Sequence, residues 1–575
     1  MNNKRVWLLF LTSTSLGGLV TACRSAPEPA DMVLYNGKIV TVDSQRPEAQ
    51  GLAIRGDTIV AVGDNAEIEA YVGSATHAID LEGKLAIPGF IEGHGHFMGI
   101  GQAKRNLDLT TAGNWEEIVE QVARAAKGAQ PGDWILGRGW HQEKWDQPPK
   151  PNLEGLPYHD SLSRAAPDNP VLLTHASGHA SFVNAKALEL AGIGLKTADP
   201  PGGQIVRGRN GAPIGMLRET AQGLVRQALA RDQAKRSAEE VEGERREQIR
   251  LAAQECLSKG ITSFQDAGSS FATVDLLKSL VREGQLPLRL WVMLREDNEK
   301  LAKSLPDYKL LDFGDHRLTV RAIKRAIDGA LGSHGAWLLQ PYADMPSSVG
   351  LNTTSVESIT ETARLAIEHG FQLCVHAIGD RANRETLNLF EKTFKQYPDK
   401  KDLRWRIEHA QHLNAADIPR FAQLGVIASM QAIHCTSDAP WVPDRLGEER
   451  ARETSYVWQK LMRSGAVVSN GTDAPVEDVS PIASFYAAVS RKLKDGTVFA
   501  PEQRMSREEA LRSYTLNAAH AAFEEKAKGS LTPGKLADIT VLSGDILTLP
   551  EDEIPDTEVV YTIVGGKVEY DASGD

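Results

Sequence analysis

The middle of the chain alternates short apolar runs with helix-like segments, and this alternation restricts the fold more than any other feature. Eight runs have the length and composition of buried strands: Leu85–Glu92, Thr262–Asp266, Leu288–Leu294, Val320–Ile327, Gln372–His376, Leu403–His409, Val426–Gln431 and Ala466–Asp473. Helix-like segments lie between most of them, such as "SAEEVEGERREQIRLAAQECLSKG", which ends at a Gly stop signal. Eight strands alternating with helices predict an α/β fold of the (β/α)8, or TIM barrel, type.

Both ends of the chain have a different pattern, with short apolar runs broken by Asn-Gly and Gly-Asp as in hairpins. Because both ends share this pattern, we predict one small β-sandwich built from residues 32–84 and 530–575. It would flank a barrel domain over residues 85–529. Residues 101–259 separate the first two candidate strands and are expected to form an inserted subdomain over the barrel mouth.

The N-terminus has the pattern of an export signal. A basic start precedes an apolar stretch from Val6 to Val20, which predicts a signal peptide over residues 1–22. The following "VTAC" resembles a bacterial lipobox, so Cys23 is expected to be lipidated and residues 23–31 to act as a tether. The protein would then be an exported, membrane-anchored lipoprotein facing the periplasm. The alternative is an ordinary signal peptide cleaved after Ala22.

Composition narrows the partners of the chain. The net charge of −12 and the lack of a Lys/Arg block disfavour nucleic acid as a partner. Apart from Cys23, the cysteines are Cys256, Cys374 and Cys435, an odd and sparse set that does not predict a disulfide framework. We expect these three to be buried packing residues. The oligomeric state is left open, with a homodimer among the options.

Polar side chains able to bind a metal stand at or near the ends of several predicted strands. They are His94, His96, Lys324, His376, His409 and Asp473. In a barrel these strand ends meet at one rim, where imidazole and carboxylate groups suit a borderline divalent metal such as zinc. Residues i and i+2 of a strand point to one side, so His94 and His96 could bind one ion. Each residue alone has an ordinary structural explanation, and only their joint placement indicates a site.

Several motifs together resemble the amidohydrolase superfamily, and within it family 3, which includes the N-substituted formamide deformylases. They are "PGFIEGHGH", "KRAIDGALGSHGAW", "VHAIGDRA", "RIEHAQ", "NGTDAPVE" and the ending "SLTPGKLADITVL". The resemblance extends from about Met32 to Tyr570. It implies a barrel with a β-sandwich from both termini, as the patterns above predict.

The resemblance also implies two divalent metal ions, expected to be zinc, and a set of ligands for them. These are His94, His96 and Asp473 for one ion, His376 and His409 for the other, and Lys324 as a bridge. Lys324 would carry a CO2-derived carboxylate, because a lysine held near two cations loses its proton more easily. The alternative for Lys324 is a buried salt bridge with Asp328. Glu92 replaces an Asp found in many members, but it is not a required ligand.

The resemblance implies hydrolysis of a C–N bond other than a peptide bond in a small molecule. The bond is expected to be that of a linear amide, cleaved by metal-activated hydroxide. Asp473 would be both ligand and catalytic base and acid. A same-fold alternative is a deaminase or a hydrolase of another bond, although deaminases of the superfamily usually lack the strand-four lysine. An alternative of another class is a non-enzymatic binding lipoprotein on a decayed scaffold.

Four further residues are candidates for contact with substrate. His179 matches a family segment and would reach the pocket from the inserted subdomain. Gln431 and His434 follow the seventh strand and could meet the substrate or a developing oxyanion. Trp140 could form a platform for substrate, with a place in the core as the alternative.

Overall fold

A parallel eight-stranded sheet forms the centre of the computed structural model, which describes residues 27–574. The predicted signal peptide and Cys23 lie outside the described residues. The strands are hydrogen-bonded in chain order: β8 (Phe90–Gly95), β17 (Ile261–Ser269), β18 (Arg289–Leu294), β20 (Leu318–Ala326), β21 (Gln372–Ala377), β22 (Arg406–His409), β23 (Ile427–Gln431) and β24 (Val468–Gly471). At the carboxyl end, the N–H of Asp473 donates to the carbonyl of His94 at 2.7 Å and joins the last strand to the first. The predicted barrel is confirmed.

Helices cover the outside of this sheet. They include α2 (Phe97–Ala103), α7 (Ala238–Ser258), α8 (Phe271–Arg282), α9 (Asn298–Ser304), α11 (Val356–His369), α12 (Asp380–Gln396), α13 (Ile418–Leu424), α17 (Trp458–Arg463), α18 (Pro481–Ser490), α19 (Arg507–Ser513) and α20 (Leu516–Ala521). The helix expected from "SAEEVEGERREQIRLAAQECLSKG" is α7, whose first turn is closed by a capping box between Ser237 and Glu240. One large apolar core joins the buried faces of these helices to the strands.

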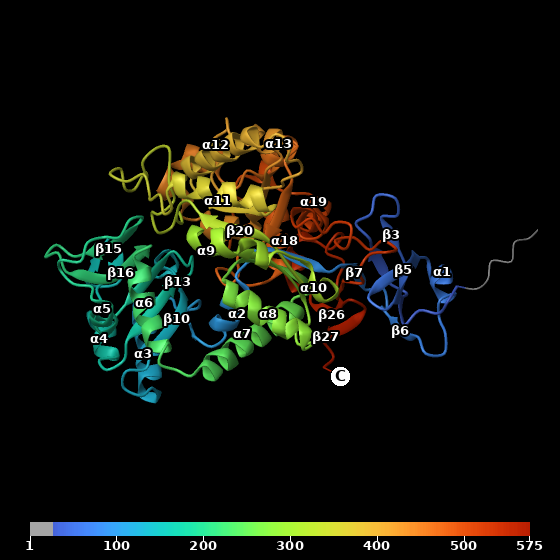
Figure 1. Cartoon of the computed structure of the whole chain (residues 1–575), viewed down its shortest axis with the longest axis horizontal. Coiled ribbons are helices and arrows are strands. Elements are labelled where there is room, and N and C mark those ends of the chain that lie inside the picture. Colours follow the sequence, from blue (N-terminus) through green and yellow to red (C-terminus); the bar gives the residue numbers. More distant parts are fainter. Residues whose placement is uncertain (1–26, 575) are drawn as a thin grey trace, which may run out of the picture.

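The two ends of the chain form a β-sandwich beside the barrel, at the right of Figure 1. One sheet has the order β5–β4–β1–β6, and the other has the order β27–β26–β25–β7–β2–β3. Their bounds are β1 (Met32–Tyr35), β2 (Lys38–Val40), β3 (Glu48–Ala49), β4 (Gly51–Arg55), β5 (Thr58–Gly63), β6 (His77–Asp80), β7 (Leu85–Pro88), β25 (Ile539–Leu542), β26 (Val559–Val564) and β27 (Lys567–Asp571). Side chains from both ends of the chain share one buried cluster. The composite sandwich of the predicted fold is therefore present.

The predicted first barrel strand, Leu85–Glu92, is divided between two sheets. Its first half is β7, which pairs with β25 of the sandwich, and its second half begins β8 of the barrel. The break falls at Gly89, where an added Cβ would lie 2.2 Å from the Thr262 hydroxyl oxygen. The sandwich thus extends past the expected boundary at residue 84, because β7 pairs with β25. Only a residue without a side chain fits at Gly89, where the chain crosses from the sandwich to the barrel.

The insertion lies at the opposite end of the molecule from the sandwich (Figure 1). Its sheet has the order β15–β16–β14–β13–β10–β9. The bounds are β9 (Leu107–Asp108), β10 (Ile135–Trp140), β13 (Val171–His175), β14 (Ala180–Val183), β15 (Gly203–Arg207) and β16 (Pro213–Glu219), with helices α3 (Trp115–Gly128), α4 (Asp160–Ala165), α5 (Ala185–Ala191) and α6 (Gln222–Gln233). It has two apolar clusters of its own. In contrast, α7 packs into the barrel core, so the end of the expected 101–259 insertion belongs to the barrel.

The remaining cysteines are buried and unpaired, as predicted: Cys256, Cys374 and Cys435. Within residues 27–574, no helix is both long enough and apolar enough to cross a bilayer.

Candidate active site

The predicted metal-binding side chains meet at the carboxyl ends of the barrel strands. They come from the first, fourth, fifth, sixth and eighth strands of the barrel: His94, His96, Lys324, His376, His409 and Asp473. Ligand atoms of His94, His96 and Asp473 lie within 4.8 Å of one another, as do those of His409, His434 and Asp473. Asp473 belongs to both groups and therefore stands at the centre of the site.

His94 is held from both sides of its ring. Its Nδ1 contacts Oε2 of Glu408, while its Nε2 lies 3.5 Å from Oδ1 of Asp473. Arg406 in turn binds the Glu408 carboxylate, with 2.7 Å between Nε and Oε1. Burial lowers the pKa of His94 to about 4, so the ring is neutral and able to act as a ligand. The contact with Glu408 was not expected from the sequence.

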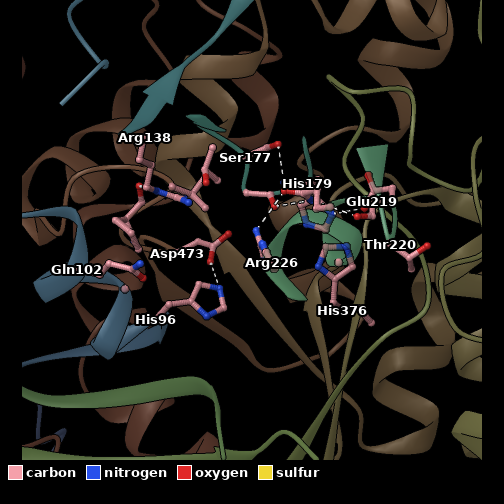
Figure 2. Close-up of a pocket in the computed structure, with 18 of the residues that line it drawn as sticks. His96, Gln102, Arg138, Ser177, His179, Glu219, Thr220, Arg226, His376 and Asp473 are labelled. Carbon is pink, nitrogen blue, oxygen red and sulfur yellow. Dashed lines mark hydrogen bonds and ion pairs between the residues drawn. The ribbon is translucent and has the colours of Figure 1, made fainter. Parts of the chain in front are cut away.

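His96 and Asp473 form the accessible side of the site. Nε2 of His96 lies 3.1 Å from Oδ1 of Asp473. Figure 2 shows the two side chains pointing toward each other, and both line the same cavity. Burial raises the pKa of the Asp473 carboxyl, but His96 and the other nearby imidazoles outweigh it and hold that pKa well below the usual range. Asp473 also has a left-handed backbone, with φ of 58°. Aspartate is among the non-glycine residues that adopt this conformation most readily.

Glu92 fixes the backbone next to Asp473. Its carboxylate accepts hydrogen bonds from the N–H and the hydroxyl of Thr472, at 2.7 and 2.9 Å. Burial raises the pKa of Glu92 to about 8. Glu92 thus connects the first and last barrel strands. Because both of its oxygens bind Thr472, this structural role agrees with the prediction that Glu92 is not a metal ligand.

His376 and His409 form the second half of the site, with 4.5 Å between their ring centroids. Nδ1 of His409 lies 2.6 Å from Oε1 of Gln431, which leaves its Nε2 for another partner. Burial holds the pKa of both imidazoles well below the usual range, so both are neutral. His409 also has a left-handed backbone, with φ of 75°.

Lys324 is buried among these groups. Its Nζ lies 3.4 Å from Nε2 of His94, and no carboxylate of the described residues forms a salt bridge with it. Asp328 instead accepts N–H bonds from Trp337, Ile378 and Gly379 at 2.8–3.0 Å. The alternative of a Lys324–Asp328 salt bridge is therefore wrong. Burial lowers the pKa of Lys324 to about 8, which makes a larger fraction of the amine neutral near physiological pH than in an ordinary lysine.

The donor set fits divalent metal ions. Nε2 of His376 and Nε2 of His434 are buried and lack a hydrogen-bond partner within residues 27–574. Unsatisfied polar atoms of this kind are rare in proteins, and here they are lone-pair donors that converge on one space. Neutral imidazoles and an ionised carboxylate are the ligands that zinc and similar ions prefer.

A cavity of about 710 Å³ opens from the site toward the insertion. His179 lies on its wall, as the sequence predicts, and its ring centroid is 4.9 Å from that of His376. Nδ1 of His179 lies 2.7 Å from Oε2 of Glu219 (Figure 2). Burial opposes protonation of His179, but Glu219 outweighs it and raises the pKa of the ring. The insertion therefore supplies a polar group directly opposite the metal-binding residues.

The other three candidate substrate residues have different positions. His434 lines a smaller adjoining cavity of about 50 Å³ and stacks on His409, with centroids 6.2 Å apart. Gln431 is instead beneath His409 and does not line either cavity. Trp140 is fully buried in the insertion core, with its Nε1–H bonded to the carbonyl of Leu173 at 2.9 Å, so it is not a substrate platform.

A closed parallel barrel with imidazole and carboxylate groups at its carboxyl rim suits a metal-dependent hydrolase, and comparison with known proteins shows this class. Residues 77–570 match the family described as "Amidohydrolase family". The chain is 34% identical over 560 residues to Protein LONG AFTER FAR-RED 3 of Arabidopsis thaliana, covering 94% of this chain and 92% of that protein. It is 31% identical to the putative amidohydrolase YtcJ of Bacillus subtilis, covering 94% and 99%.

Two further similarities extend over most of the chain. N-substituted formamide deformylase of Arthrobacter pascens is 27% identical, with 95% of this chain and 99% of that protein covered. The crystal structure of an uncharacterized metal-dependent hydrolase from Pyrococcus horikoshii superimposes with a TM-score of 0.72 at 27% identity, covering 91% and 99%. The chain belongs to the amidohydrolase family of metal-dependent hydrolases.

Proposed function

We propose that this enzyme hydrolyses the C–N bond of a linear amide in a small molecule, using two divalent metal ions. The observation that carries the proposal is the convergence of four neutral or partly exposed imidazoles, one ionised carboxylate and one buried lysine on a single space. His94, His96 and Asp473 would hold one ion, and His376 and His409 the other. Zinc is the expected metal, because imidazole nitrogen and carboxylate oxygen are among its usual ligands in catalytic sites.

Lys324 is proposed to bridge the two ions as its carbamate. The lowered pKa of its amine favours the neutral form, whose nitrogen lone pair can form a bond to the carbon of CO2 with release of one proton. The resulting carboxylate would supply a negative group between the ions. No carboxylate of residues 27–574 forms a salt bridge with Lys324. A bridging lysine also favours hydrolysis over deamination, the same-fold alternative.

Bound divalent ions lower the pKa of water and polarise a carbonyl oxygen. Asp473 is ionised and central, so it is placed to accept the proton of the attacking water and to pass it to the leaving amine. His179 faces the metal-binding residues from the insertion, and Glu219 fixes its ring. It can donate a hydrogen bond to the amide oxygen as negative charge develops there.

The relatives support an amide as substrate, since one of them is named for removing formyl groups from N-substituted formamides. The test is metal analysis of the purified protein, followed by a panel of N-formyl, N-acetyl and longer N-acyl amides. We expect close to two metal ions per chain and hydrolysis of at least one amide class. His94→Ala should lose both metal and activity, whereas His316→Ala, a surface histidine, should lose neither. A protein that contains no metal after growth with ample zinc would contradict the proposal.

A further inference from the structure

Three arginines that form no salt bridge with a carboxylate of the described residues line the large cavity next to the predicted metal ligands: Arg138, Arg226 and Arg295. Arg138 belongs to β10 and Arg226 to α6, both in the insertion, whereas Arg295 follows the third barrel strand β18. Arg226 and Arg295 are solvent-accessible because they face the cavity. Cationic groups from three separate elements thus converge on the space where a substrate would lie.

Few of the guanidinium N–H groups are used within the protein. Arg138 donates to the carbonyls of Pro475 and Ala176, at 3.1 and 3.0 Å, and Arg226 donates to Oε1 of Gln222 at 3.1 Å. The Arg295 guanidinium has no hydrogen bond to any described residue. Since a guanidinium carries five N–H donors, most of the donors around this cavity are left for a ligand or water.

The carboxylates of the cavity wall form no salt bridge with these arginines, although Asp473 favours the charged form of Arg138 at longer range. Glu219 binds His179, Asp328 accepts three backbone N–H groups, and Asp473 contacts His96. Desolvation lowers the pKa of all three arginines, and Arg226 lowers that of Arg138 further, as Arg295 does for Arg226. Three mutually repelling cations therefore face the same cavity.

Three buried arginines of the described residues bind carboxylates, whereas Arg491 bonds only to backbone carbonyls. Arg289 binds Asp538, Arg406 binds Glu408, and Arg445 binds both Glu143 and Asp344. Pairing is the usual way to keep a buried charge, because an unpaired one is costly. The three cavity arginines have no such partner among the described residues and face the cavity, where an anionic group of a ligand would supply one.

We propose that the substrate carries an anionic group in addition to the scissile amide, and that Arg138, Arg226 and Arg295 bind this group. Carboxylate and phosphate-type groups share the required chemistry, because guanidinium binds both through paired N–H donors. The inference rests on the proposed amide hydrolysis and adds the charge of the substrate. It predicts that neutral and cationic amides of equal size are poor substrates.

The experiment uses the metal-loaded enzyme and three series of amides: N-acyl ω-amino carboxylic acids, their methyl esters, and the matching N-acyl aminoalkylphosphonates. We expect kcat/KM for the anionic amides to exceed that for the esters by about 10- to 100-fold, since charge-assisted hydrogen bonds give this order of selectivity. Added salt should reduce the difference. The carboxylate and phosphonate series distinguish the two kinds of anion.

Variants assign the selectivity to the arginines. Arg226→Met and Arg295→Met should each reduce the ratio of anionic to neutral kcat/KM at least tenfold, and the matching Lys variants should retain part of it. Arg231→Met is the control, because Arg231 lies on the same helix but outside the cavity lining. Thermal melting curves would identify any variant that fails to fold.

Each result supports or overturns the proposal. Equal kcat/KM for acids and esters in the wild-type enzyme, or a preference that persists in both Met variants, would overturn the anion site while leaving amide hydrolysis intact. If the whole panel is inert, amide hydrolysis fails instead, and calorimetry with the same compounds tests the anion site alone. Tighter binding of acids than of esters, lost in the Met variants, would then support it, and equal binding would refute it.

Discussion

Glu408 and His94 form a buried pair at the carboxyl end of the barrel, and the pair sets the orientation of the first imidazole proposed to bind metal. Oε2 of Glu408 contacts Nδ1 of His94, and Arg406 binds the same carboxylate from the other side. With the Nδ1 proton held by a carboxylate, the lone pair of Nε2 points toward Asp473 and Lys324. A residue outside the ligand set thus determines which nitrogen of His94 is available.

Glu408→Gln should weaken metal binding. The amide keeps the shape of the side chain but removes the charge that favours the Nδ1–H tautomer of His94. Loss of such a supporting partner typically costs about 10- to 100-fold in metal affinity or activity. Metal content after dialysis against a graded series of chelator concentrations measures the effect. Glu391→Gln is the control, because Glu391 lies on α12 and pairs with Lys395 and Arg420. Equal metal retention in both variants would contradict the role of Glu408.

Lys324→Ala should remove most of the activity, because the variant lacks the group proposed to bridge the ions. Short-chain carboxylates such as acetate or propionate should restore part of it by occupying the vacated space. Lys303→Ala, at an exposed position, should have no effect with or without carboxylate. Turnover by Lys324→Ala equal to that of the wild type would refute the bridge. Carbon-13 NMR after exchange with labelled CO2 tests the carbamate directly.

His179→Asn should reduce kcat without releasing metal. His179 faces the metal-binding residues from the insertion and is not among their ligands, so its loss removes a hydrogen-bond donor to substrate. Removal of one donor to a developing oxyanion costs about 100- to 1000-fold in kcat in comparable sites. Steady-state kinetics and metal analysis on the same preparation separate the two effects. A variant that loses metal in proportion to activity would show that His179 acts on the metal site instead.

Labelled fatty acid supplied to expressing bacteria should be incorporated into the full-length protein if Cys23 is lipidated. Cys23→Ala should abolish the incorporation, whereas Cys256→Ala, at a buried position in the barrel core, should not. Lipid label on the Cys23→Ala variant, or its absence from the wild type, would leave an ordinary export signal as the better explanation.

The barrel and the meeting of the candidate metal ligands at its rim were predictable because strand length, the alternation of strands with helices and i, i+2 spacing can be read from the sequence, and because the motifs resemble a known family. Glu408 was not, because it adjoins His409, and neighbouring residues of a regular strand point to opposite faces. Both nevertheless contact the site, since His409 leaves strand geometry with a φ of 75°. No residue type marks this turn in advance. The same holds for Asp473, whose left-handed backbone follows a strand that reads as regular.

Errors of position had a similar origin. Gln431 was a candidate because it follows the seventh strand, and Trp140 was a candidate platform with the core as the alternative, but the contacts of both depend on tertiary packing. Trp140 enters the insertion core, and Gln431 reaches His409 on the neighbouring strand. The arginines of the cavity carried no local signal either, because they come from β10, α6 and the end of β18. Only the folded chain brings these three segments together.

Asp538→Asn should destabilise the joint between sandwich and barrel. Asp538 precedes β25 of the sandwich and binds Arg289 of barrel strand β18 through two contacts, at 2.7 and 3.0 Å. Both side chains are buried, and removing one partner of such a pair costs about 3–5 kcal/mol. Glu361→Gln, in an exposed pair with Arg364, should cost only about 0–1 kcal/mol.

The effect of Asp538→Asn should depend on pH in a defined direction. Burial raises the pKa of Asp538, but Arg289 outweighs it and holds the folded-state pKa below the ordinary value. The pair therefore stabilises the fold fully above about pH 4, the unfolded pKa of an aspartate, and its contribution is lost as the pH falls through the folded-state pKa. Melting midpoints of wild type and variant should differ most near neutral pH and converge in acid. A difference that grows as the pH falls would show that the carboxylate of Asp538 is not the stabilising group.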